Sequence, residues 1–347
     1  MRQARWTEDG VEVAEVTPPE LPPEWVRLRV AACGICGTDL HLWRRELAAP
    51  LGIAPGHEMT GTPLAGPRGL ADALYAVEPI HVCGVCDFCV SGRRQLCPGL
   101  SIIGIMRSGG LADFVDVPAY ALHRVHSSVS PLVASFAEPL AVCVRGISLA
   151  GLSDDSRVLV LGAGAIGLVS GLLARDRARE VAITARHPQQ REAARQLGLV
   201  ALAESEVKAW LADAQPDVVL ETVGGHATTL LDATRWCRPG GRIVVLGIFS
   251  QRAELSAYNV ATRELEIVGS NMYGTGRRGP QFRSAVELLP RYAAELSRLQ
   301  THQFGLDQVA EAFRCAGDKT SGAIKVTVVP GDGNSSAAPG TSRSSDE

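Results

Sequence analysis

The stretch "VLVLGAGAIGLVSG", residues 158–171, carries the strongest indication of the fold. Four apolar residues that read as a buried strand lead directly into Gly162, Gly164 and Gly167, which form the pattern G-x-G-x-x-G at the start of a helical pattern. The first glycine permits a tight turn, the second lets the backbone approach a pyrophosphate, and the third lets the helix pack closely on the strand. The N-terminus of that helix then faces the phosphates.

The same stretch allows two simpler interpretations. Glycines also occur in ordinary tight turns, and the apolar run from 158 to 174 resembles a membrane span. The run is shorter than a spanning helix and is interrupted by glycines, which argues against a span. A second strand pattern, "EVAIT" at 180–184, follows the helix, and the strand–helix–strand order favours a dinucleotide-binding unit.

Strand and helix patterns continue to alternate through residues 139–275. Helical patterns lie at 188–198, 206–214 and 226–237, and strand patterns lie at 217–224, 242–249 and 266–271. Such a β-α-β series predicts a mostly parallel sheet with helices on both faces. We therefore predict an α/β protein with a doubly wound Rossmann domain over 139–275.

The rest of the chain has a different pattern. Residues 1–138 contain short β-rich pieces separated by Pro- and Gly-containing turns, such as the piece at 25–36. Two helical patterns, at 281–296 and 306–317, and a strand pattern at 323–329 follow the Rossmann domain. We expect 1–138 and 276–330 to form a second, β-rich domain. The Ser-, Gly- and Pro-rich end, 331–347, is expected to be a disordered tail.

Composition and charge limit the classes of partner. A chain of 347 residues suits two domains, and its net charge of −3 gives no overall attraction to nucleic acid or to an anionic membrane. The charged N-terminal segment lacks the apolar core of a signal peptide, so we expect a cytoplasmic protein. Thiols remain reduced in that compartment, which favours metal binding over disulfides for clustered cysteines.

The residues after the second Rossmann strand bear on the choice of cofactor. An acid at this position accepts a hydrogen bond from the ribose 2′-OH of NAD. The sequence "AITARHPQQ", 182–190, instead places Ala185 and Arg186 there, with no acid. A small residue leaves room for a 2′-phosphate, and a guanidinium pairs well with it. The alternative is that Arg186 is only a solvated surface residue, and of the two we predict that NADP is preferred over NAD.

Four cysteines occupy the stretch "CGVCDFCVSGRRQLC", residues 83–97. Cys83, Cys86, Cys89 and Cys97 have the spacing of a closed tetrahedral zinc site, which leaves no open position for a substrate. A nucleic-acid-binding zinc ribbon would need more basic and aromatic neighbours than Arg93 and Arg94 provide. We therefore predict a structural zinc site in this segment.

Candidate ligands for a second metal are scattered through the first 138 residues. Three stretches contain them: "CGICGTDLH" at 33–41, "PGHEMTG" at 55–61 and "FAEPLAVC" at 136–143. A catalytic zinc needs three protein ligands of mixed type and one open position. Cys36, His57 and one carboxylate, either Glu58 or Glu138, could supply them. Each of these residues alone is more often packing or surface, so spacing by itself would not find this site.

In this order, these stretches, the cysteine cluster and the glycine motif resemble the zinc-dependent medium-chain dehydrogenases/reductases, with the sorbitol and threonine dehydrogenase branch nearest. The resemblance covers about residues 10–330. It implies a GroES-like catalytic domain, a Rossmann domain and an active cleft between them. The segment between "GHE" and the cysteine cluster, 59–82, is shorter than in most relatives and lacks a "GDRV"-like turn.

The resemblance also implies roles for individual residues. Cys36 and His57 match ligands of the catalytic zinc, Glu58 matches a neighbouring carboxylate that can approach the metal, and Glu138 stands where polyol dehydrogenases have a glutamate ligand. Thr38 matches the hydroxyl beside the substrate oxygen, and His41 matches the end of a proton relay. The cysteine cluster matches the structural-zinc lobe. The cofactor positions implied are Gly162, Gly164, Ala165, Ile166, Gly167, Ala185, Arg186, Arg191, Val223, Gly247, Ser270, Asn271 and Lys325.

We therefore expect a zinc-dependent NAD(P) oxidoreductase with two zinc ions per chain. Its substrate would be a small secondary alcohol (polyol, sugar-derived or amino alcohol) or the matching ketone, and the chain would form a homodimer or homotetramer. Neither nucleic acid nor membrane is expected as a partner. Two alternatives are a zinc-free NADPH carbonyl or enone reductase on the same fold and a catalytically silent dinucleotide-binding homologue. The combination of Cys36, His57 and Glu138 argues against both.

Overall fold

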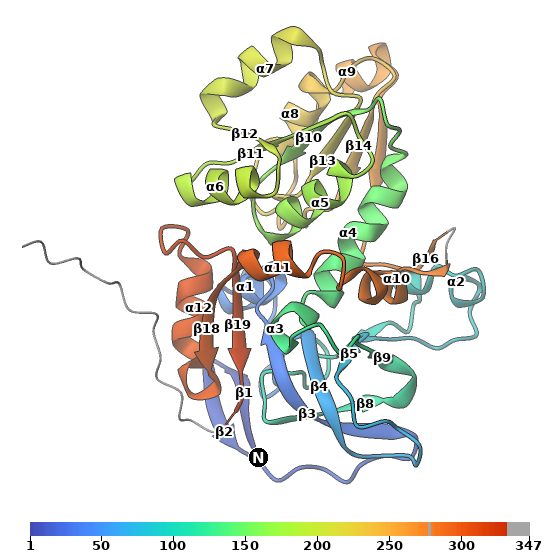
Figure 1. The fold of residues 1–347 in the computed structure, drawn as a ribbon, viewed down its shortest axis with the longest axis vertical. Coiled ribbons are helices and arrows are strands. Elements are labelled where there is room, and N and C mark those ends of the chain that lie inside the picture. Colours follow the sequence, from blue (N-terminus) through green and yellow to red (C-terminus); the bar gives the residue numbers. More distant parts are fainter. Residues whose placement is uncertain (277–278, 332–347) are drawn as a thin grey trace, which may run out of the picture.

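A computed structural model describes residues 1–276 and 279–331 of the protein. Two sheets dominate it, one above the other in Figure 1, with helices between them. The upper part contains the green-to-yellow middle of the chain, and the lower part combines the N-terminal and C-terminal segments. The predicted tail, 331–347, lies outside the described residues except for Gly331.

The upper sheet has six parallel strands in the order β12-β11-β10-β13-β14-β15. Its central strand β10 is buried along its whole length, as expected where helices cover both faces of a parallel sheet. The predicted doubly wound α/β fold is therefore confirmed. The strands are β10 (Arg157–Leu161), β11 (Glu180–Thr184), β12 (Val200–Leu202), β13 (Val218–Glu221), β14 (Arg242–Val245) and β15 (Glu266–Gly269). The helices are α5 (Ala165–Arg175), α6 (Pro188–Gln196), η3 (Glu204–Glu206), α7 (Val207–Asp213), α8 (Thr229–Trp236) and α9 (Ala257–Thr262).

The lower part is built on a seven-stranded sheet in the order β18-β19-β3-β4-β5-β9, with β8 also paired to β3. The long strand β3 (Trp25–Gly34) alternates buried and less buried residues, which places one face on the core. The other strands are β4 (Glu58–Ala65), β5 (Tyr75–Val77), β8 (Phe114–Pro118), β9 (Leu122–Arg124), β18 (Gln300–Gly305) and β19 (Lys325–Val329). The shortened segment 59–82 thus supplies most of β4 and all of β5, which pair antiparallel.

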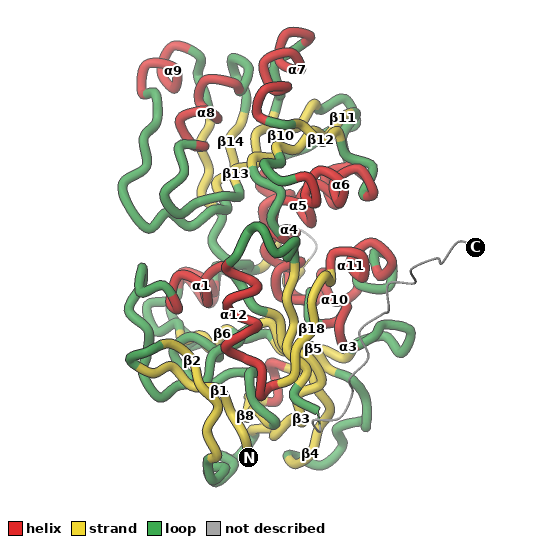
Figure 2. The backbone as a smooth tube through the Cα atoms, turned by 90° about the vertical axis from the view of Figure 1, so that its left-hand side faces the viewer, coloured by secondary structure: helices red, strands yellow, loops and turns green. Residues whose placement is uncertain are grey.

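Small elements complete the lower part. They are β1 (Arg2–Thr7), β2 (Gly10–Glu15), α1 (Gly37–Trp43), β6 (Ile80–His81), α2 (Asp87–Val90), η1 (Arg94–Leu96), β7 (Ser101–Ile102), η2 (Ala119–Ala121), β16 (Thr275–Gly276), β17 (Gly279–Pro280), η4 (Leu306–Gln308) and α12 (Val309–Gly317). Figure 2 shows α1 at the top of the lower part, next to the upper part, and α12 running downward from there.

Four helices join the two parts: α3 (Pro131–Ala134), α4 (Ala137–Ala150), α10 (Gln281–Leu288) and α11 (Ala293–Leu299). One apolar core runs through them and contains both Val158 of β10 and Ala76 of β5. The predicted boundary at 138/139 falls inside α4. Both this boundary and the one at 275/276 stay predictions. Among the described residues, no helix is long and apolar enough to cross a membrane.

The expected helix over 281–296 is wrong in one respect. The chain forms α10 and α11 with a break between them. Pro290 lies in the break, and proline lacks the N–H that a continuous helix needs.

Candidate active site

A cavity of about 610 Å³ lies between the upper sheet and the β-rich part. Its walls come from the glycine loop and the end of β11 on one side, and from α1, β4 and β19 on the other. Of the predicted site residues, the walls include Cys36, Glu58, Gly162, Gly164, Ala165, Ile166, Ala185, Arg186, Val223 and Lys325. This size is within the range of small-molecule and cofactor sites.

The glycine loop has the geometry expected of a phosphate-binding turn. Gly162 has a φ of +96°, which a residue with a side chain rarely adopts. A Cβ on Gly167 would lie 1.8 Å from the carbonyl oxygen of Gly162, so only glycine allows this contact of helix on strand. A Cβ on Gly164 would meet nothing within 4 Å, so the backbone there is open to a ligand. All three predicted roles of the glycines therefore have a structural counterpart.

The end of β11 contains no carboxylate. Ala185 is buried and Arg186 is exposed, and both line the cavity. The Arg191 side chain does not line it, and donates instead to the carbonyl oxygens of Ala185 and Arg186 at 3.0 Å. Arg191 therefore positions the turn that carries Arg186.

Three other predicted cofactor residues lie outside the cavity wall. Gly247 follows β14 and packs against Glu221, where a Cβ would lie 2.3 Å from the carboxylate. Ser270 is buried and its backbone donates to Val245, whereas Asn271 is exposed. Their roles as cofactor contacts stay predictions.

One cluster of possible metal ligands lies at the cavity floor. The donor atoms of Cys36, His57 and Glu58 are within 4.8 Å of one another. Cys36 is the N-cap of α1, just after the end of β3, and His57 and Glu58 stand at the start of β4. The two strands pair there, with Gly34 opposite Glu58, and this brings the three side chains together. Burial alone would raise the pKa of the Cys36 thiol, but the neighbouring His57 outweighs it and lowers that pKa.

Asp39 also belongs to this site, although sequence reasoning gave it no role. It is completely buried, and its Oδ2 accepts a hydrogen bond from the Cys36 backbone at 2.9 Å. Its Oδ1 lies 3.6 Å from Nδ1 of His57, and neither of these two atoms has a hydrogen-bond partner. Burial disfavours the charged imidazole, but Asp39 and Cys36 together raise the pKa of His57. The signal was present in "CGTDLH", where the acid follows the thiol by three residues.

The two predicted carboxylates have different surroundings. Glu58 forms an ion pair with Lys325 in which both side chains are only 2% exposed, and Lys325 also donates to the Ile35 carbonyl at 3.2 Å. Glu138, in the first turn of α4, does not belong to the cluster formed by the donor atoms of Cys36, His57 and Glu58. Burial, together with the charge of Asp39, raises the pKa of Glu138 to about 7, with His57 acting in the opposite direction.

The predicted proton-relay residues lie on α1. Thr38 is half-buried and sits between two cavity-lining residues, Gly37 and Leu40, without lining the cavity itself. Nδ1 of His41 is in hydrogen-bond contact with the Glu46 carboxylate. The ring also approaches the upper part, because a Cβ on Gly225 would lie 3.8 Å from Cε1 of His41.

The four cysteines of the segment 83–97 converge in a separate lobe. Their sulfur atoms all lie within 4.8 Å of one another, and those of Cys83 and Cys97 are 3.5 Å apart. Hydrogen bonds from the backbone of Val85 and Cys86 lower the pKa of Cys83 to about 6. Four sulfurs at this spacing fit a closed zinc site, and none of them lines the cavity.

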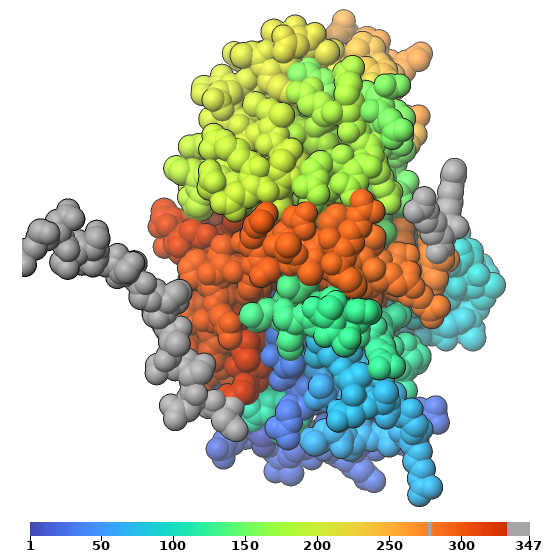
Figure 3. All heavy atoms as spheres, in the orientation of Figure 1, coloured from blue at the N-terminus to red at the C-terminus, as the bar shows by residue number. Residues whose placement is uncertain are grey.

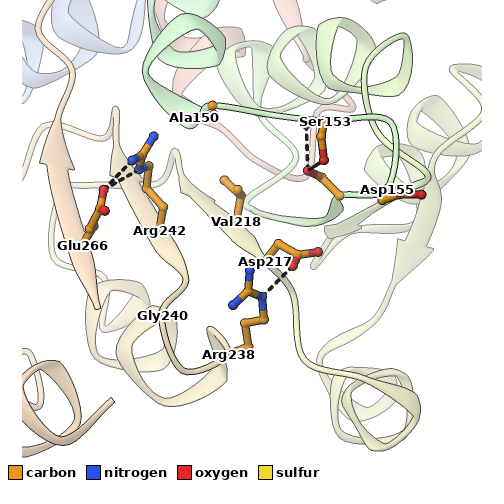
Figure 4. Close-up of a pocket in the computed structure, with 11 residues that line it drawn as sticks. Ala150, Ser153, Asp155, Asp217, Val218, Arg238, Gly240, Arg242 and Glu266 are labelled. Carbon is orange, nitrogen blue, oxygen red and sulfur yellow. Dashed lines mark hydrogen bonds and ion pairs between the residues drawn. The ribbon is translucent and has the colours of Figure 1, made fainter. Parts of the chain in front are cut away.

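A smaller cavity of about 260 Å³ lies at the N-terminal ends of β13, β14 and β15 (Figure 4). Its two arginines are already paired, Arg238 with Asp217 and Arg242 with Glu266. No predicted site residue lines it. The larger cavity is therefore the candidate active site.

Comparison with known proteins gives two family matches. The family described as "Alcohol dehydrogenase GroES-like domain" matches residues 22–127, and "Zinc-binding dehydrogenase" matches residues 165–291. The two matches cover the β-rich part and the six-stranded sheet with its glycine loop.

Similar proteins span nearly the whole chain. L-threonine 3-dehydrogenase of Sinorhizobium medicae is 30% identical over 337 residues, covering 91% of this chain and 95% of that protein. A zinc-binding dehydrogenase of Sinorhizobium meliloti, solved with NADP bound, is 32% identical with a TM-score of 0.86 and covers 95% and 99% of the two chains. Galactitol-1-phosphate dehydrogenase of Escherichia coli is 25% identical with a TM-score of 0.85, covering 95% and 100%.

Proposed function

This chain belongs to the zinc-dependent medium-chain dehydrogenases, in the branch of the threonine and sorbitol dehydrogenases, and we propose that it interconverts a small secondary alcohol and its ketone with NADP as the hydride carrier. One observation carries the proposal above all others. A single cavity is lined by Cys36 and Glu58 of the ligand cluster and by the glycine loop that would hold a dinucleotide.

The residues of the cluster fit a zinc ion. Thiolate sulfur, imidazole nitrogen and carboxylate oxygen are the donor types that catalytic zinc sites use. Asp39 faces Nδ1 of His57, which leaves Nε2 as the nitrogen available to the metal, the arrangement usual for a zinc-bound histidine. Cys36 and His57 would hold the ion, and Glu58 or Glu138 would complete the set. The four cysteines of residues 83–97 would hold the second, structural zinc.

In the proposed reaction, the alcohol loses a proton from oxygen and a hydride from carbon, giving the ketone. When bound, zinc would supply a Lewis acid that lowers the pKa of the alcohol, and the nicotinamide cofactor would supply the hydride acceptor. In this proposal the Thr38 hydroxyl would accept the proton from the alcohol oxygen and pass its own proton toward a neutral His41, whose Nδ1 contact with the Glu46 carboxylate holds the imidazole in place. The cavity walls orient the substrate carbon and exclude water. The reverse reaction, ketone reduction, uses the same groups.

The cofactor choice rests on Arg186. A guanidinium paired with a 2′-phosphate contributes about 1.5–3 kcal/mol, which is roughly ten- to a hundredfold in affinity. Arg186→Ala should therefore weaken NADPH binding by that factor and leave NADH binding nearly unchanged. Titration of both cofactors into wild type and variant tests this. Equal affinities in the wild type, or an equal loss of both cofactors in the variant, would refute the NADP assignment.

The substrate class is tested by activity. Purified protein is assayed with NADP across polyols, sugar-derived alcohols, amino alcohols and simple secondary alcohols, and with NADPH across the matching ketones. We expect turnover with at least one small polar secondary alcohol. Turnover of enones with no activity on any alcohol or ketone would favour a reductase of a different kind. Within this proposal the protein acts in the cytoplasm as a homodimer or homotetramer.

A further inference from the structure

A second positively charged side chain lines the cavity together with Arg186, and it comes from the β-rich part of the protein. We call this region, where Arg186 stands, the cofactor end of the cavity. Lys319 lies in the loop between α12 and β19, and it lines the cavity together with Arg186 and His187 of the upper part. We propose that Lys319 binds the 2′-phosphate of NADP from the opposite side to Arg186. This inference rests on the proposed function, because it names a further residue for the same cofactor.

The loop is held against the turn that carries Arg186. The side-chain nitrogen of Gln189 donates to the backbone carbonyl of Lys319 at 3.0 Å. Gln189 is three residues after Arg186 and belongs to the first turn of α6, whose N-terminal end adds a partial positive charge. Figure 1 shows the same proximity, because the red loop after α12 lies directly beneath α6. In the space-filling view of Figure 3, the corresponding red and yellow-green atoms adjoin. The hydrogen bond therefore joins the two parts at the phosphate end of the cavity.

The cations at this place lack an anion. Neither Arg186 nor Lys319 forms an ion pair with a carboxylate within the described residues, although Glu204 and Asp232 line the same cavity. Arg44 is close enough to Lys319 to act on it electrostatically, and it donates at 2.8 Å to the carbonyl of Gly317, the last residue of α12. Lys319 is exposed, and Arg44 adds a second positive charge near it. A phosphomonoester dianion is the chemical group that such a pair of cations on two walls would bind.

The proposal has a mechanical consequence. Arg186 belongs to the Rossmann side and Lys319 to the β-rich side, so a 2′-phosphate between them would connect the two parts. NAD, which lacks this phosphate, would leave the contact between the two parts at this end of the cavity to the hydrogen bond of Gln189.

The test separates the 2′-phosphate from the rest of the nucleotide. Binding of 2′,5′-ADP and of 5′-AMP is measured by titration calorimetry for wild type, Lys319→Gln, Lys319→Arg and Lys208→Gln. Lys208 is the matched control, because it is an exposed lysine of α7 in the upper part that does not line the cavity. We expect Lys319→Gln to weaken 2′,5′-ADP by about tenfold and to leave 5′-AMP within about twofold. Lys319→Arg and Lys208→Gln should both stay within about threefold of wild type for 2′,5′-ADP.

Two results would overturn the inference and leave the NADP assignment intact. One is an equal loss of 2′,5′-ADP and 5′-AMP in Lys319→Gln, and the other is no loss of either. In both cases Arg186→Ala would still lower the affinity for 2′,5′-ADP alone. If the wild type itself does not distinguish 2′,5′-ADP from 5′-AMP, the proposed cofactor choice and this inference both fail.

Discussion

Breaking the buried ion pair between Lys325 and Glu58 should strongly destabilise the β-rich part. Both side chains are 2% exposed although they border the cavity, so Lys325→Met would leave the Glu58 carboxylate without its lysine counter-ion in a largely buried position. Removing one partner of a buried pair typically costs about 3–5 kcal/mol of unfolding free energy. The lost hydrogen bond to the Ile35 carbonyl adds to this cost.

Removing both charges should recover much of the loss. The double variant Glu58→Gln/Lys325→Met has no uncompensated charge, and replacing a complete buried pair is often nearly neutral. We expect it to be at least about 2 kcal/mol more stable than Lys325→Met alone. The exposed-lysine variant Lys208→Met should stay within about 0.5 kcal/mol of wild type.

Urea unfolding followed by tryptophan fluorescence measures these differences. Five proteins are compared at one pH and one zinc concentration, because a ligand that binds the folded state changes the apparent stability. They are the wild type, Lys325→Met, Glu58→Gln, the double variant and Lys208→Met. A loss below about 1 kcal/mol in Lys325→Met would refute the reasoning. A double variant whose loss equals the sum of the two single losses would show that the two side chains do not interact.

Three further predictions concern the glycine loop, the cysteine lobe and the contact between α5 and the break before α11. Gly167→Ala places a Cβ 1.8 Å from the Gly162 carbonyl oxygen, so helix α5 and strand β10 must move apart. We expect the free energy of unfolding to fall by about 1–3 kcal/mol and cofactor binding to weaken. Unchanged NADPH affinity would count against the predicted packing role. Cys89→Ser should remove the zinc of the lobe and lower thermal stability, because the metal-binding energy of such a site is folding energy; a well-folded variant with its full zinc content would argue against a structural site. Asp176 accepts from Tyr292 at 2.8 Å and pairs with Arg291, and although burial opposes this, the two partners lower the pKa of its carboxyl. A carboxylate with a lowered folded pKa contributes stability that is complete above its unfolded pKa of about 3.9 and is lost as the pH falls through the folded value. Asp176→Asn should therefore cost about 1–2 kcal/mol at neutral pH and progressively less below about pH 4, and a constant difference across pH would contradict the ion-pair explanation.

The sequence predicts the Rossmann sheet well because its signals are local. The glycine motif, the apolar strand β10 and the helix α5 are consecutive in the chain, and each of the three glycines has its own steric reason. The cysteine lobe is predictable for the same reason, since its ligands lie within fifteen positions of one another. Even the break between α10 and α11 is encoded locally, by Pro290, although the helical pattern on both sides conceals it.

The active-site details depend on contacts between distant residues. Glu58 and Lys325 are 267 positions apart, and no periodicity relates them. Whether Glu58 or Glu138 approaches the metal depends on how α4 packs against β4, which follows from the whole core. Asp39 is adjacent to the ligands in sequence, but its role appears only when its distance to His57 is known. Lys319 likewise joins the cofactor end of the cavity only through the packing of the two parts.

The zinc content of the purified protein tests the central claim most directly. Zinc per chain is measured by elemental analysis in wild type and in His57→Ala, with NADPH affinity measured on the same samples. Two clusters of ligands predict about two zinc ions per chain in the wild type and about one in the variant, with NADPH binding retained. A wild type with one zinc ion per chain, or a His57→Ala variant that keeps as much zinc as the wild type, would contradict a catalytic zinc held by Cys36 and His57.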